Sequence, residues 1–192
     1  MKARLAIFAT MCVVVVLNAC GDPTNLKATL PTVTDTLSLF ALSGTPPSYP
    51  SGISLLGATA VRVDGFANFD AAFDINGSGN VVVYPVKLVV ASPGGSRPVG
   101  LLKAAGTFQN VLEAPATGYQ TDASVVLAPG ETVVLQSVHN SSQDVCQFAL
   151  SPYLYAKIGV DSVNLASRTI YLQLGLDPNC GFRSFVSGIP TS

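Results

Sequence analysis

Charged residues make up only 11% of this 192-residue chain, tryptophan is absent, and histidine occurs once. The few basic residues form no cluster that could neutralise phosphates, so nucleic acid is not an expected partner. Valine, leucine, serine, threonine, glycine and proline are abundant instead. This composition is typical of an exported β-rich protein.

Motifs that would indicate an enzyme are also missing. The chain contains no CxxC, HExxH, GxSxG, GxGxxG or P-loop pattern. His139 lies in a polar segment with Ser141, Ser142 and Asp144, and a loop histidine of this kind is expected to be a solvated surface residue. Asp70 and Asp74 could serve as an acid/base pair on one strand face, although surface solvation explains them equally well. We therefore predict no catalytic residues, no cofactor and no enzymatic activity.

No apolar run is long enough to cross a bilayer as a helix. The longest, from Leu5 to Leu17, has 13 residues and is interrupted only by Thr10. Lys2 and Arg4 precede it and make a short cationic region. The three-part pattern predicts a secretory signal at residues 1–19.

The signal ends at Leu17-Asn18-Ala19-Cys20, which resembles the lipobox of bacterial lipoproteins. The resemblance implies that the Cys20 thiol receives a diacylglyceryl group, that the signal is cut before Cys20, and that the new amino terminus is acylated as well, for example with palmitate. Two or more acyl chains give stable membrane attachment. A plain secretory signal is the alternative interpretation.

The resemblance also implies an address in the bacterial cell envelope. Some lipoproteins carry an aspartate after the lipidated cysteine for retention in the inner membrane; here that position is Gly21, and Asp22 follows one place later. This favours the outer membrane, facing either the periplasm or the surface. After removal of Lys2 and Arg4 with the signal, 8 basic and 11 acidic residues remain, a net charge of −3.

The four cysteines separate by position. Cys12 would leave with the signal and Cys20 would carry lipid, which leaves Cys146 and Cys180. Two remaining thiols in an oxidising compartment are expected to pair, and the bridge would close a loop of about 35 residues. A metal site is the alternative, but a structural zinc ion would need four ligands.

Residues 20–34 are predicted to be a lipidated terminus and a tether, because they are small and polar and include Pro23 and Pro31. Residues 35–192 are predicted to form a single domain. Strand-like alternation appears at residues 36–41, 53–56, 61–63, 68–75, 80–91 and 132–138, with weaker candidates at 106–113 and 120–128. The strongest hairpin pairs residues 154–161 with 169–176.

No window after Cys20 sustains helical spacing. About nine or ten short strands separated by Gly/Pro turns predict an all-β fold, an antiparallel two-sheet β-sandwich of immunoglobulin-like or jelly-roll-like type, with a closed β-barrel as the alternative. Pro129-Gly130-Glu131 is expected to join residues 120–128 and 132–138 as a hairpin, and Pro85 is expected to mark a bulge or an edge.

Two surface features could bind a ligand. Asp74, Asn76, Ser78 and Asn80 place oxygen atoms at alternate positions, as in the first half of a calcium loop, but Pro85 occupies the position of the bidentate glutamate, so a hairpin turn is favoured. An aromatic group could bind sugar or a partner protein, yet burial in a second core is favoured. Its members are Tyr153, Tyr155, Tyr171, Phe182 and Phe185.

Three functions follow in order of preference. The first is a membrane-anchored envelope lipoprotein that acts as a non-enzymatic interaction or structural module, with an envelope protein or a glycan as its partner. The second is a carbohydrate-binding or small-ligand-binding sandwich, assisted by calcium. An envelope hydrolase ranks last.

Overall fold

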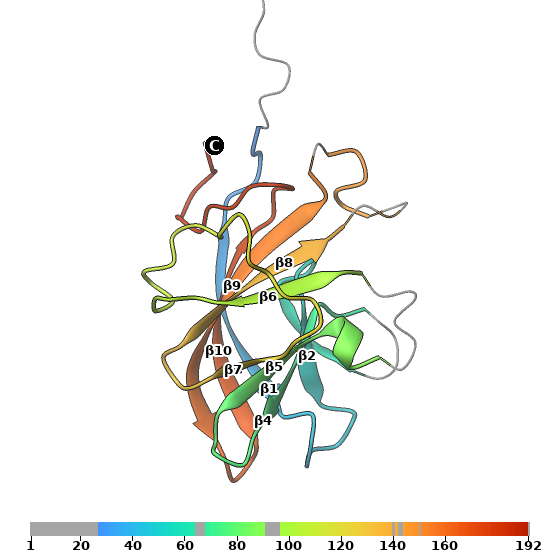
Figure 1. Ribbon diagram of the computed structural model, residues 1–192, viewed down its shortest axis with the longest axis vertical. Helices are drawn as coiled ribbons and strands as arrows, with labels where there is room; N and C mark the ends of the chain where they lie inside the picture. The colour runs from blue at the N-terminus through green and yellow to red at the C-terminus, as the bar shows by residue number, and fades with distance from the viewer. Residues whose placement is uncertain are drawn as a thin grey trace, which may run out of the picture.

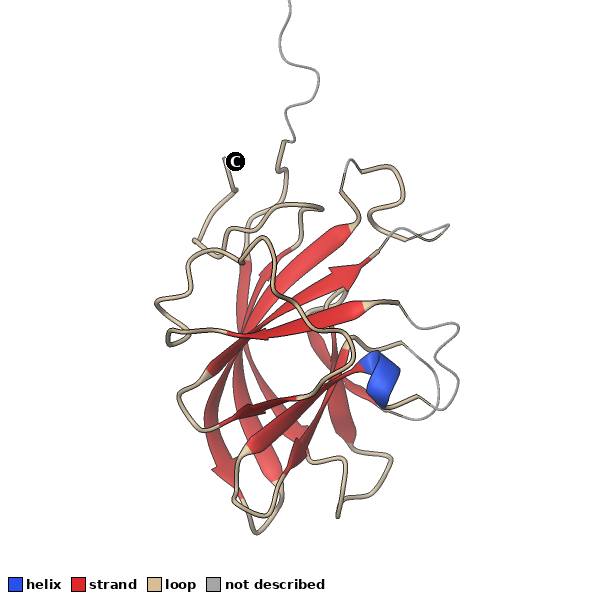
Figure 2. Ribbon diagram, viewed as in Figure 1, coloured by secondary structure: helices blue, strands red, loops and turns tan. Residues whose placement is uncertain are grey.

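The described residues form ten strands arranged in two layers (Figures 1 and 2). The computed structural model describes residues 27–63, 68–90, 97–139, 141, 144–149 and 151–191. The strands are β1 (Val33–Phe40), β2 (Pro50–Ser54), β3 (Thr59–Arg62), β4 (Ala71–Ile75), β5 (Val81–Pro85), β6 (Val99–Lys103), β7 (Val125–Leu127), β8 (Thr132–Val138), β9 (Tyr153–Asn164) and β10 (Thr169–Asp177). One 3-10 turn, η1 (Val86–Leu88), follows β5.

The strands form two separate antiparallel sheets. One sheet has the order β1-β10-β9-β8-β6 and the other β3-β2-β4-β5-β7. The predicted two-sheet sandwich is therefore confirmed, and the sheets do not close into the alternative barrel. The described part of the chain contains no helix of the length and apolarity that a membrane span requires.

The core lies between the sheets. Alternate residues of the first sheet, such as Leu39, Leu135 and Leu172, pack against Phe73 and Val83 of the second, and all five are almost fully buried. Interleaved side chains from two facing sheets are the usual core of a sandwich. The alternation of apolar and polar residues thus turns the apolar face of each of these strands toward the core.

The predicted hairpin of β9 and β10 is confirmed, with Ile158 opposite Leu174 and Ala156 opposite Leu176. Its turn contains Arg168 at φ 51°, and the side chain of Asn164 accepts hydrogen bonds from the amides of Ala166 and Ser167. Such side-chain acceptors replace ladder bonds in tight turns. The β4–β5 hairpin is confirmed as well.

The expected hairpin across Pro129-Gly130-Glu131 is wrong. β7 pairs with β5 in one sheet, whereas β8 pairs with β6 and β9 in the other. The turn therefore carries the chain from one layer to the other. Short polar turns look alike in sequence whether the next strand pairs back or changes sheet, so local pattern could not decide between them.

The strand pattern differs from the structure at three further places. Residues 106–113 form no strand, the strand predicted for residues 80–91 ends at Pro85 because η1 follows, and β6 is not predicted by the sequence pattern. Pro85 is thus a strand end and not a bulge. The short, glycine-containing VGLLK segment of β6 lacks the alternation on which strand prediction depends.

The N-terminal signal, Cys20 and residues 21–26 of the predicted tether lie outside the described residues. From Thr29 onward the chain contacts the domain: the amide of Thr32 donates to the carbonyl of Gly188, and β1 begins at Val33. The end of β1 at which the chain enters the domain also holds the C-terminal segment (Figure 1).

Candidate functional site

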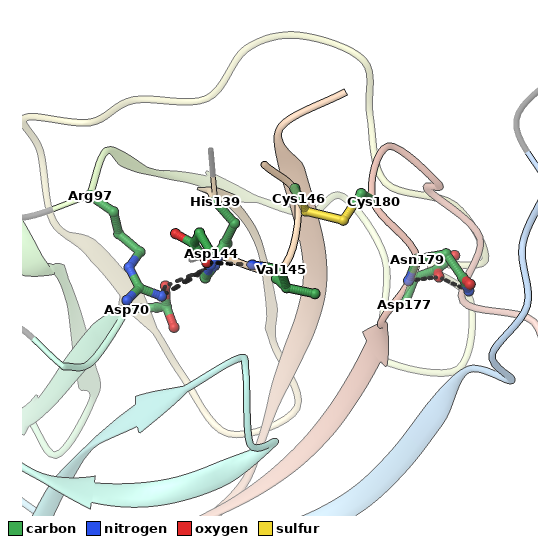
Figure 3. The surroundings of a disulfide bond; sticks show 9 residues. All are labelled: Asp70, Arg97, His139, Asp144, Val145, Cys146, Asp177, Asn179 and Cys180. Atoms are coloured by element: carbon green, nitrogen blue, oxygen red, sulfur yellow. Dashed lines mark hydrogen bonds and ion pairs between the residues drawn. A yellow bond between two sulfur atoms is a disulfide. The ribbon is translucent and has the colours of Figure 1, made fainter. Parts of the chain in front are cut away.

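A cluster of charged side chains is buried at the end of the sandwich where β8 finishes (Figure 3). Asp70 precedes β4 in one sheet, while Ser137 and His139 come from the end of β8 in the other. Arg97 precedes β6, and Asp144 lies in the loop after β8. Asp70, Ser137 and His139 have no exposed surface. The prediction of a solvated His139 is therefore wrong.

Asp70 is the common acceptor of the cluster. One of its oxygens accepts the Ser137 hydroxyl at 2.5 Å, and the other accepts the Leu55 amide at 2.7 Å. His139 Nε2 and the Arg97 guanidinium each lie 3.6 Å from the first oxygen. A buried carboxylate is tolerated only with such partners. Asp70 thus links the two sheets through polar contacts.

His139 lies between two carboxylates. Its Nδ1 is 2.9 Å from Asp144, whose other oxygen accepts the Ser141 hydroxyl, and Arg97 approaches the ring nitrogens at 3.2 and 3.4 Å. The histidine amide also donates to the carbonyl of Pro152. The imidazole is therefore held by side-chain and backbone contacts together.

The cluster controls the ionisation of both carboxyl groups. Burial raises the pKa of Asp70, but hydrogen bonds from His139, Leu55 and Ser137 and the charge of Arg97 outweigh it, so the net pKa is lowered. Burial likewise raises the pKa of Asp144, and contacts with His139, Val145 and Ser141 again outweigh it and lower the net value. Both groups are thus favoured as carboxylates.

The geometry of the cluster does not match a nucleophile activated by a base. The Ser137 hydroxyl donates to Asp70 instead of to His139, and it is fully buried. A hydrolytic triad requires the hydroxyl to face the histidine and the substrate. Asp74, which could have formed an acid/base pair with Asp70, lies elsewhere in an ion pair with Arg168.

The disulfide lies beside this cluster. Cys146 and Cys180 are joined, with Cα atoms 5.7 Å apart, which confirms the predicted pair. The bridge connects the loop after β8 to the segment after β10, and the Cys146 amide donates to the carbonyl of His139. Figure 3 places the disulfide between the charged cluster and the turn of Asp177 and Asn179.

Asn179 joins the N-terminal segment of the described chain to the turn after β10. Its side-chain oxygen accepts the amides of Thr29 and Leu30, and its side-chain nitrogen donates to the carbonyl of Leu30 and to Asp177. The sequence pattern assigns Asn179 only to a strand-ending turn. Nothing in that local pattern shows that its partner lies 150 residues away.

Asp177 is buried next to this turn, and one of its oxygens has no hydrogen-bond partner. Burial raises the pKa of Asp177 even though Asn179 and the Ser184 amide oppose the shift. The protonated carboxyl is thus favoured more than in water.

The calcium candidate folds as a turn. The Asn76 side chain accepts the amides of Ser78 and Asn80, and Gly79 adopts φ 80°. Asp74 instead accepts Ser43 and Arg168, at 2.7 to 3.2 Å. The side-chain oxygens of Asp74 and Asn76 are therefore both engaged in hydrogen bonds within the protein. In the described part of the chain, no three His, Cys, Asp or Glu side chains are grouped as metal ligands.

The aromatic candidates divide between core and surface. Tyr155 and Phe185 belong to a second apolar cluster, Phe182 is buried, Tyr153 packs against the cluster, and Tyr171 is exposed. Burial in a second core, the favoured interpretation, is thus confirmed for most of them.

Tyr119 also packs against this second cluster. Burial and the neighbouring Tyr155 raise the pKa of Tyr119, and the charge of Arg183 opposes the shift.

This second cluster lies under the 104–120 segment on the outer face of the first sheet. Lys157 is buried there, and its ammonium donates to the carbonyls of Phe108 at 2.6 Å and Val111 at 2.9 Å. Burial lowers its pKa. A Cβ on Gly159 would lie 2.9 Å from Phe108, so the glycine gives the segment room to approach. Lys157 thus fastens the segment to β9.

An open pocket of about 500 Å³ lies at the edge of the same segment. Its polar lining includes Lys103, Asn110 and Glu113. Lys103 is paired with Glu131 and Glu113 with Arg183, so two of these groups already have partners.

Comparisons with protein-family models, with characterised proteins and with solved structures found no significant match to this chain.

Proposed function

We propose that the protein is a lipid-anchored envelope lipoprotein whose β-sandwich acts as a non-enzymatic interaction or structural module. The observation that carries the proposal is Leu17-Asn18-Ala19-Cys20 after a short cationic and apolar signal. The disulfide supports an oxidising compartment. We place the protein in the outer membrane in preference to the inner membrane, because Gly21 follows Cys20.

A structural role for the buried cluster supports the non-enzymatic part of the proposal. His139 contacts the carboxylates of Asp70 and Asp144, and Arg97 contacts Asp70, so the charged groups are paired within the cluster. Asp70 also accepts the Ser137 hydroxyl from the other sheet. A catalytic base would need to reach a substrate proton at about 3 Å. The His139 ring has no exposed surface through which it could do so.

The anchor is tested by intact mass analysis of the mature protein and by Cys20→Ala. The parent is expected to fractionate with membranes and to begin at an acylated Cys20, whereas the variant remains unprocessed by the lipoprotein route or becomes soluble. Cys12→Ala is the matched control, because it removes a cysteine from the signal and leaves Cys20 intact. An unacylated amino terminus at another residue would refute the proposal.

A glycan or small-ligand binding function is the second candidate, and the pocket beside residues 102–115 is the observation that favours it. Ligand pockets bring several free polar groups to one apolar cavity, whereas this one is open and its charged groups are paired. A screen of oligosaccharides by thermal unfolding tests it. A concentration-dependent rise in Tm, abolished by Asn110→Ala, would move this function to first place.

A further inference from the structure

Three segments meet at the end of the sandwich where the chain enters. Asn179 holds residues 29–30, the Cys146–Cys180 disulfide attaches the loop after β8, and Thr32 donates to the carbonyls of Val186 and Gly188. Residues distant in sequence are thereby fixed on one surface.

This surface carries a group of exposed apolar side chains, which we call the apolar rim. Its members are Leu30 (51% exposed), Val145 (54%), Phe148 (93%), Val186 (54%) and Ile189 (56%). Single exposed apolar residues are common and need no explanation. Here five of them lie on three segments that covalent and hydrogen bonds hold at one end of the sandwich, and exposed apolar side chains gathered in this way mark contact surfaces.

The charges around the apolar rim are suited to a lipid surface. Residues 27–32, 145–149 and 179–191 include no aspartate or glutamate, and their charged residues are Lys27 and Arg183. Asp144, which precedes Val145, is turned inward to His139 and its side chain is only 9% exposed. Asp177 is buried. Arg183 pairs with Glu113, whose side chain is 62% exposed, so anionic headgroups would meet this ion pair beside the segments but no exposed carboxylate from the segments themselves.

The chain outside the structure limits how far the apolar rim can be from the anchor. Eight residues lie between Cys20 and Thr29, and the nine residue-to-residue steps can span at most about 30 Å. β9 begins near the disulfide end and runs 12 residues to Asn164, so the β9–β10 turn lies about 40 Å farther along the strand. The end of the sandwich that carries the apolar rim is therefore the end that lies close to Cys20.

We propose that the apolar rim rests on the bilayer surface to which Cys20 is attached, so that the sandwich stands on the membrane in one orientation. This rests on the proposed function. Phe148 would enter the boundary between headgroups and acyl chains, where aromatic side chains are enriched. The opposite end, with the β9–β10 turn, would face away from the membrane and be available to a partner.

The absence of tryptophan from the chain allows a direct test. Phe148→Trp is introduced into the full-length, lipidated protein, which is reconstituted in phosphatidylethanolamine/phosphatidylglycerol vesicles whose acyl chains are brominated. Leu165→Trp is the matched control, because Leu165 is 61% exposed in the β9–β10 turn. We expect brominated lipid to quench most of the tryptophan emission of the Phe148→Trp variant and to leave that of the Leu165→Trp variant nearly unchanged.

Val186→Trp, on another segment of the apolar rim, repeats the measurement if the first variant does not fold. Equal quenching at both ends, or none at either, would overturn the proposed orientation. A blue shift of the Phe148→Trp emission without quenching would also overturn it, since a second copy or a protein partner would then cover the apolar rim. Mass analysis of the same samples reports acylation of Cys20 separately, so failure of the anchor is distinguished from failure of the orientation.

Discussion

At the scale of single residues, Asp70 has the greatest predicted effect on stability. We expect Asp70→Asn to lower the free energy of unfolding by about 3–5 kcal/mol, because Arg97 and His139 lose a buried partner. Urea denaturation measures the loss. Asp74→Asn, which breaks the partly exposed pair with Arg168, should cost about 1 kcal/mol or less. Similar losses for the two variants would show that Asp70 does not join the sheets.

Asp177 should give the opposite pH dependence to Asp70. The folded-state pKa of Asp70 is lowered, so its stabilisation is present above the unfolded pKa and is lost as pH falls through the folded value. The pKa of Asp177 is raised, so its ionisation destabilises the folded state as pH rises above the unfolded value of about 3.9.

Replacing Asp177 by asparagine removes that penalty. We expect the stability of Asp177→Asn relative to the parent to increase between about pH 4 and pH 7, measured by urea denaturation at each pH. Any change in hydrogen bonding to Asn179 adds an offset that does not vary with pH. A stability difference that is the same at both pH values would contradict the raised pKa.

At the scale of elements, the disulfide and the segments it joins act together. Cys146→Ala with Cys180→Ala should lower the free energy of unfolding by about 3–4 kcal/mol, since the bridge closes a long loop in the unfolded chain. Each single variant should lose about as much as the double variant, because either one removes the whole bridge. Additive losses would show that packing of the cysteines, and not the bond, is responsible.

The elements also show what the sequence could predict. Residues 154–161 and 169–176 have a clean 2-residue period, and they form β9 and β10 as expected. The period of residues 68–75 predicts one buried and one polar face, but Ala72 and Asp70 are fully buried, so β4 is covered on both faces. The alternation of residues in a strand indicates which of its faces is apolar. It does not indicate whether a segment distant in sequence covers the polar face.

The buried cluster could not be predicted for the same reason. His139 and Asp144 are close in sequence, so the sequence alone shows that they can meet. Asp70 and Arg97 reach them only because β4, β6 and β8 converge in the fold. Pairing of Cys146 and Cys180 was predictable because cysteine chemistry depends on the compartment more than on topology. Long-range partners of charged residues have no comparable signal in a single sequence.

At the scale of the whole molecule, topology sets the folding rate. β1 pairs with β10, so Val33 lies opposite Leu176, and the described strands cannot complete their first sheet until nearly the whole chain is present. Sandwiches dominated by such distant pairings fold in milliseconds to seconds. We expect refolding of the mature chain, disulfide intact, in this range by stopped-flow dilution from urea, and a main phase in microseconds would contradict the β1–β10 pairing.

The pairing of β1 with β10 also gives the domain a mechanical property. In the proposed lipoprotein, a pull on Cys20 would reach the domain through β1, whose eight residues pair in register with β10 from Val33 to Phe40. When the far end is held by a partner, the pull runs along the strand, so all the inter-strand hydrogen bonds are loaded at once in shear instead of being opened one by one. In the proposed lipoprotein, β1 would therefore carry the mechanical force between the membrane and a partner bound to the opposite end of the sandwich.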